Sequence, residues 1–154
     1  MTWIIFSIAF FCYYGAISLR HAWFQTGSWD LGIFDQATYL ISQGLTPNSS
    51  LLNFHIIGDH GSLVLYPIGW LSIIFPSVKL LFTLQGLALA STVFPLAKIA
   101  KNNNLSKKLT ITSLLVFLLY PVIFNVAIFD FHPEVLAVQL IMELILLISY
   151  RNSN

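Results

Sequence analysis

Four apolar stretches of the chain are long enough to cross a lipid bilayer, and they limit the fold more than any other feature. The hydrocarbon core is about 30 Å thick, so a spanning helix needs about 20 apolar residues. Residues 1–19, 77–97, 109–128 and 134–150 meet this requirement, the last with help from its interfacial ends. Only 8% of the 154 residues are charged, against about 25% in a soluble domain. The sequence therefore predicts an all-α integral membrane protein with four transmembrane helices, and it excludes soluble proteins and nucleic-acid binders.

Residues 62–75 decide the membrane topology of the chain. As a helix they extend about 21 Å, less than the hydrocarbon core, and Pro67 and Gly69 weaken them further. We therefore expect a surface helix here, within an outer loop over residues 20–76. The N-terminus and the lysine-rich loop 98–108 are then cytoplasmic, which is the side that Lys and Arg favour. An alternative with five spans and an outer N-terminus satisfies this charge rule slightly better, so the charges alone leave both open.

The outer loop contains a segment with helical periodicity at residues 29–43. Its apolar side chains recur on one face: Leu31, Phe34, Thr38 and Ile41. Gly44 is expected to end the helix. Asp30 and Asp35 lie about 140° apart around it, so one can face a site while the other faces solvent. This segment is predicted to be a second surface helix.

Two clusters of acids and imidazoles are candidate sites on the outer side. Residues 53–61 contain His55, Asp59 and His60, whose side chains are ligands for divalent metals. Their spacing matches no known zinc motif, and ordinary polar loop residues are the competing interpretation.

The second cluster is the motif FDFHPE at residues 129–134, with Asp130, His132 and Glu134. Pro133 suits the first position of a helix, and the start of a helix can receive a phosphate. The competing interpretation is a helix cap at the interface, anchored by Phe129 and Phe131.

Polar side chains are also predicted inside the bilayer. Gln139 and Glu143 are four residues apart and share one face of the last span, and Gln85 lies in the second. An intramembrane carboxylate is a functional candidate by default. Hydrogen bonding between helices is the alternative that we favour.

Three segments together carry a resemblance to a known family. They are WDLGIFDQATY, the histidine-led segment that begins HGSLVLYPIGW, and FDFHPEVLAV. Over about residues 20–145 the chain resembles an uncharacterised family of predicted bacterial and archaeal multi-span membrane proteins. That family is similar to glycosyltransferases of the GT-C type, which take sugars from polyprenyl-phosphate donors.

The resemblance implies a function at the outer membrane face. It implies a GT-C-like bundle in which 29–43 and 62–75 are juxtamembrane helices, and this supports the four-span topology. Asp30 and Asp130 correspond to catalytic acids, and His60, His132 and Glu134 to groups that bind a divalent metal or phosphate. Asp35, Asp59 and His55 are secondary candidates. The expected location is the cytoplasmic membrane, with several spans and a cytoplasmic N-terminus.

The chain also departs from this family. Its members are longer and have more spans, so this chain corresponds to their N-terminal part. Gly61-Ser62-Leu63 stands where the family often has an apolar residue and a proline after the histidine. A second chain that supplies the missing spans is therefore an expected partner. The alternative function is a non-enzymatic membrane component or a truncated remnant that needs such a partner.

Overall fold

The computed structural model describes residues 1–151, which fold into helices joined by short loops. The long elements are α1 (Thr2–Ala22), α5 (Lys79–Ser91), α6 (Val93–Asn102), α7 (Lys107–Leu118), α8 (Pro121–Ile128) and α9 (Leu136–Arg151). The shorter ones are η1 (Ser28–Gly32), α2 (Ile33–Ser42), α3 (Ile57–His60), α4 (Leu65–Ser72) and η2 (Pro133–Val135). An isolated antiparallel bridge joins Asn48 and His55.

Three helices within residues 1–151 are long and apolar enough to cross a membrane. They are Thr2–Ala22, the continuous pair α5–α6 over Lys79–Asn102, and Pro133–Arg151. The pair α7–α8 is together also long and apolar enough, but the two helices are bent by 53° relative to each other. The pair adds a fourth crossing only if the two helices form one span. The predicted all-α membrane fold is confirmed, with three or four crossings.

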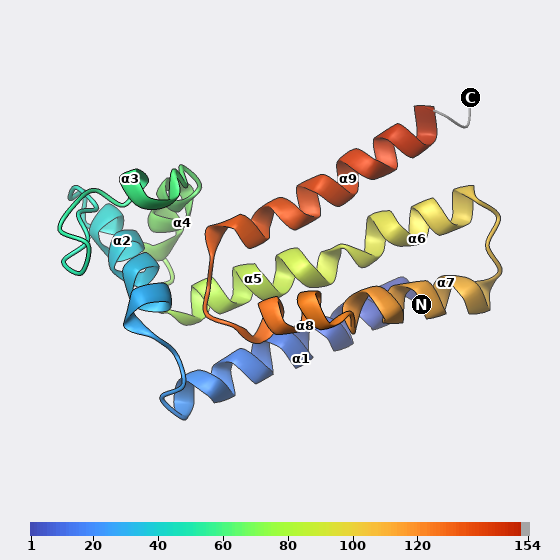
Figure 1. Cartoon of the computed structure of the whole chain (residues 1–154), viewed down its shortest axis with the longest axis horizontal. Coiled ribbons are helices and arrows are strands. Elements are labelled where there is room, and N and C mark those ends of the chain that lie inside the picture. Colours follow the sequence, from blue (N-terminus) through green and yellow to red (C-terminus); the bar gives the residue numbers. More distant parts are fainter. Residues whose placement is uncertain (152–154) are drawn as a thin grey trace.

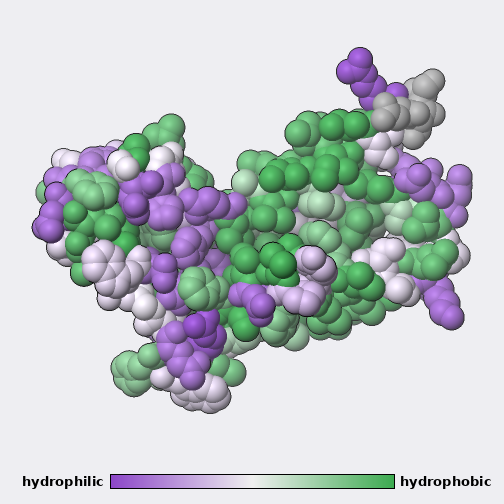
Figure 2. Space-filling view, in the orientation of Figure 1, coloured by the Kyte–Doolittle hydropathy of each residue, from purple (hydrophilic) through white to green (hydrophobic). Residues whose placement is uncertain are grey.

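The molecule has an apolar middle between two polar ends. The long helices lie alongside one another, and α2, α3 and α4 gather beyond one end of them (Figure 1). The turn between α6 and α7 lies at the other end, with the N-terminus on the same side of the bundle (Figure 1). Hydrophobic side chains cover the long helices, and hydrophilic ones gather over α2–α4 and at the opposite end (Figure 2). Exposed apolar side chains on the long helices, such as Ile8, Phe11, Leu140 and Leu144, are compatible with contact to lipid.

The second crossing is longer than the sequence indicated, so the loop that follows it is shorter than the predicted residues 98–108. The helix continues through Lys98 and Lys101 to Asn102, and residues 103–106 form a tight turn. Lysines are favourable in the last turn of a helix because its carbonyl end is partly negative. Ser106 then caps α7 by accepting a hydrogen bond from the Leu109 N–H at 3.3 Å.

The predicted helix 109–128 is broken after Leu118. Pro121 lacks an N–H and cannot continue the helix, so it begins α8 instead. The Tyr13 hydroxyl donates to the Leu118 carbonyl at 2.7 Å. The fully buried amide of Gln85 donates to carbonyls at the other end of α8, including that of Phe129 at 2.9 Å. In an apolar interior these side chains provide partners that carbonyls at helix ends otherwise lack.

The loop over residues 20–76 folds around close packing between α2 and α4. Helix α2 ends at Ser42 with Gln43 as its C-cap, and the next residue, Gly44, has the left-handed φ of +70° that the sequence predicted for the residue that stops the helix. The second surface helix is shorter than residues 62–75, because α4 covers only Leu65–Ser72. A Cβ atom at Gly69 would lie 2.5 Å from Cβ of Ile41, so glycine is required for this contact. At about 12 Å long, α4 cannot cross a bilayer.

Candidate functional site

Acidic and imidazole side chains from three separate segments meet between α2, α3 and the start of α9. They are Asp30, Asp59, His60, Asp130, His132 and Glu134. Three contacts join an imidazole to a carboxylate. His60 lies 3.1 Å from Asp59 and 2.9 Å from Glu134, and His132 lies 3.5 Å from Asp30. All of these side chains are partly accessible except Asp130, which is 3% exposed.

Both ring nitrogens of each imidazole lie close to an oxygen atom. The two nitrogens of His60 face the carboxylates of Asp59 and Glu134. Nδ1 of His132 lies 3.1 Å from the carbonyl oxygen of Asp130, while its Nε2 faces Asp30. Each ring therefore makes one hydrogen bond through Nδ1, His60 to Glu134 and His132 to the Asp130 carbonyl, while its Nε2 lies near a further carboxylate.

Asp130 is held by the backbone of Gly27. The Gly27 N–H donates to Oδ2 of Asp130 at 2.6 Å. The other oxygen, Oδ1, is buried and has no hydrogen-bond partner within residues 1–151. A buried carboxylate oxygen without a partner is costly, so Oδ1 is a natural position for a ligand contact.

Gly27 also brings the two candidate catalytic acids together. A Cβ atom on Gly27 would lie 3.5 Å from Asp130 Oδ2 and 3.7 Å from Asp30 Oδ2. The sum of these two distances is the upper limit of the separation between the two oxygens. Nothing in the sequence indicated this role for Gly27. Its backbone is extended (φ −98°), a conformation that does not require glycine.

Asp30 lies in a widened helical turn, η1, that leads into α2. The Gly32 N–H bonds back to the carbonyl of Gly27, five residues earlier, at 3.3 Å. Such π-type turns are rare and frequently occur at functional sites. Here the turn carries Asp30 toward His132, whereas Asp35 on α2 lines a separate cavity of about 240 Å³ with Ser42 and Ser72. Desolvation raises the pKa of Asp35, and the nearby charge of His21 partly opposes this.

The ring of Phe34 packs against both imidazoles. It is fully buried, and its ring meets His60 at a centroid distance of 4.9 Å and His132 at 5.6 Å, both edge to face. It also meets Phe131 at 5.9 Å. The sequence indicated only that Phe34 lies on the apolar face of a helix.

A cavity of about 570 Å³ opens beside this cluster, and its lining combines ionisable and apolar side chains. The ionisable ones are His60, Asp130, His132 and Glu134, and the others are Asn125 and Val126 of α8, Phe129, Val135 of η2 and Val138 of α9. Arg20 packs near this cavity, because its guanidinium donates to the Ile128 carbonyl and lies 5.7 Å from the Phe129 ring. The cavity therefore suits an amphiphilic molecule with a polar group and an apolar chain.

The remaining sequence candidates lie apart from this cluster. Nδ1 of His55 accepts from the Ile57 N–H, and its Nε2 lies 3.4 Å from the Tyr66 hydroxyl, which ties the loop to α4. Gln139 donates to Glu143 within α9 at 2.9 Å. Gln85 links α5 to α8, as described above.

The donor chemistry suits a divalent metal, although a complete ligand cage is not formed. Carboxylates and imidazoles are common metal ligands, and Asp130 Oδ1 is buried without a partner. In the described part of the chain, no group of three or more His, Cys, Asp or Glu side chains is arranged so that it could hold a metal ion. A metal here would need a small closure of these side chains or an oxygen ligand from a substrate.

Comparison with known proteins identifies a family. No curated protein and no solved structure matches the chain. Residues 20–154 match the family described as "Predicted membrane protein (DUF2079)", which covers most of the chain. The chain is therefore a member of this family of membrane proteins.

Proposed function

We propose that the chain is the N-terminal part of a membrane glycosyltransferase that takes a sugar from a polyprenyl-phosphate donor at the outer membrane face. The observation that carries this proposal is the cavity whose lining combines acids and imidazoles with apolar side chains. A polyprenyl-phosphate sugar has the same two parts, a charged head and a hydrocarbon tail. The GT-C-like bundle and the juxtamembrane roles of α2 and α4 belong to the same proposal.

Asp30 and the imidazoles divide the chemistry between them. The carboxylate of Asp30 takes the proton from the acceptor hydroxyl, and the hydroxyl oxygen then attacks the anomeric carbon of the sugar. The bond from that carbon to the phosphate oxygen breaks, and polyprenyl phosphate leaves. Ring N–H groups of His60 and His132 donate hydrogen bonds to the departing phosphate. Backbone N–H groups at the start of the last helix, beside Glu134, can also receive it.

Asp130 is buried, and its two carboxylate oxygens have different roles in this proposal. Gly27 fixes one of its oxygens and leaves the other for a ligand. A divalent metal would be held by Asp130 and His132, with the His132 ring coordinating it instead of donating to the phosphate, and when bound it would supply positive charge to the phosphate. A second chain with further spans would complete the binding of donor and acceptor.

The orientation of the chain is part of the proposal and can be measured. With four crossings and a cytoplasmic N-terminus, Asn48 faces outward and Asn103 faces the cytoplasm. Both residues are exposed. In a Cys12→Ser background, Asn48→Cys should react with a membrane-impermeant thiol reagent from outside intact cells, and Asn103→Cys only after the membrane is opened. The reverse pattern would contradict this orientation.

Transfer from a labelled donor tests the function itself. Membranes that contain the chain should move labelled sugar from a polyprenyl-phosphate carrier to an acceptor, above the level in matched membranes that lack it. A longer member of the family provides the positive control. If the longer protein transfers sugar, and this chain neither does so nor binds the donor, the non-enzymatic alternative replaces the proposal.

A further inference from the structure

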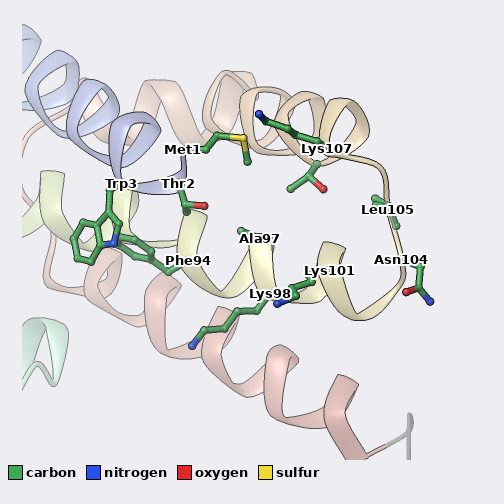
Figure 3. A pocket seen from close by; sticks show the side chains of 11 residues that line it. Met1, Thr2, Trp3, Phe94, Ala97, Lys98, Lys101, Asn104, Leu105 and Lys107 are labelled. Atoms are coloured by element: carbon green, nitrogen blue, oxygen red, sulfur yellow. The ribbon is translucent and has the colours of Figure 1, made fainter.

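A second cavity lies at the end of the bundle opposite the acidic cluster. It has a volume of about 780 Å³ and lies between the start of α1, the end of α6 and the start of α7. Three lysines line it: Lys98 and Lys101 extend from α6, and Lys107 extends from α7 on the other side (Figure 3). The proposed glycosyltransferase chemistry makes no use of this cavity.

These three lysines have no acidic partner in the part of the chain that the structure describes. Five of the six side-chain carboxylates lie in the outer loop or in the motif at 129–134, and the sixth, that of Glu143, accepts from Gln139. Within residues 1–151, none of the three lysine side chains has an ion pair or a hydrogen bond. Uncompensated positive charge around one cavity attracts an anion.

The rest of the lining suits a lipid more than a soluble anion. Trp3 packs against Phe94 with their ring centroids 4.6 Å apart, and the Trp3 side chain remains 70% exposed. Tryptophan favours the headgroup level of a bilayer. The hydroxyl of Thr2 and the amide of Asn104 add neutral hydrogen-bonding groups to the lining (Figure 3). The cavity thus combines flexible cations with an aromatic wall that can lie against acyl chains.

We propose that this cavity binds the phosphate headgroup of an anionic membrane lipid. Basic pockets between membrane helices recognise such headgroups, and each lysine has a long stem and three rotatable donors with which to reach a phosphate. Lysines that only set the orientation of the chain need no particular arrangement within the loop. Here three of the four lysines in residues 98–108 surround one cavity.

Quenching of Trp3 by brominated lipids tests this proposal in the full chain. Trp23, Trp29 and Trp70 are exposed and are changed to phenylalanine, which leaves Trp3 as the reporter. The chain is placed in phosphatidylcholine vesicles that contain a small, equal fraction of brominated phosphatidylglycerol or brominated phosphatidylcholine. We expect the anionic lipid to bind beside Trp3 at least about tenfold more strongly. Each of Lys98→Gln, Lys101→Gln and Lys107→Gln should lower this preference by about fivefold, as expected when one of the charges that contact the headgroup inside the cavity is removed.

Lys108→Gln is the matched control, because it removes the same charge next to Lys107 from a side chain outside the cavity lining. It should change the preference by less than twofold. Equal quenching by the two lipids in the chain with all its lysines, or an equal effect of Lys108→Gln, would overturn the proposal. Millimolar inorganic phosphate should leave the quenching by the anionic lipid unchanged. If phosphate abolished this quenching, the assignment to a lipid would be overturned.

Discussion

Replacement of Asp30 by asparagine is expected to lower sugar transfer by about 10²–10⁴-fold, which is the usual contribution of a general base. Asparagine has the same shape but cannot take a proton from the acceptor hydroxyl. The contact with His132, now 3.5 Å, remains available as a hydrogen bond to the amide oxygen. The expected defect is therefore in the rate of transfer, with donor binding largely retained. The measurement is the initial rate with labelled polyprenyl-phosphate sugar.

Asp35→Asn is the matched control for this variant. It makes the same change on the same surface segment, but Asp35 lines a different cavity. It should alter the transfer rate by less than threefold. A rate within tenfold of normal for Asp30→Asn would remove Asp30 from the role of base. A comparable loss in Asp35→Asn would point to general damage to the outer loop.

Replacement of Phe34 by alanine is expected to lower the free energy of unfolding by about 3–5 kcal/mol, the range for a buried phenylalanine. The side chain is fully buried and touches His60, His132 and Phe131. Its loss opens a cavity at the point where the outer loop meets the start of α9. The measurement is equilibrium unfolding of the purified chain in mixed micelles, followed by circular dichroism.

Two further variants separate packing from position. Tyr39→Ala removes an aromatic ring from the same helix, at a site that is 59% exposed, and should change the stability by less than about 0.5 kcal/mol. Phe34→Leu keeps most of the apolar volume and should recover more than half of the lost stability. If Phe34→Ala is no more harmful than Tyr39→Ala, Phe34 does not hold the two imidazoles in place.

Local signals were sufficient for several elements of this fold. The apolar stretches predicted the membrane helices because their length and composition alone satisfy a bilayer. Pro133 was expected at the first position of a helix and stands there at the start of η2. Gly44 was expected to end a surface helix and does so with a positive φ. Each of these features depends on residues that are neighbours in the chain.

The sequence by itself determined that this is a helical membrane protein, which chemical groups it can offer, and where several of its helices start or stop. The tertiary structure alone decided which groups meet. Asp30 and Asp130 are a hundred residues apart, and Gly27 brings their carboxylates to one point. Gly69 looked like a weak helix position and is instead the contact through which α4 packs on α2. Such contacts depend on the relative positions of distant helices, and the periodicity of one segment contains no information about the shape of its partner.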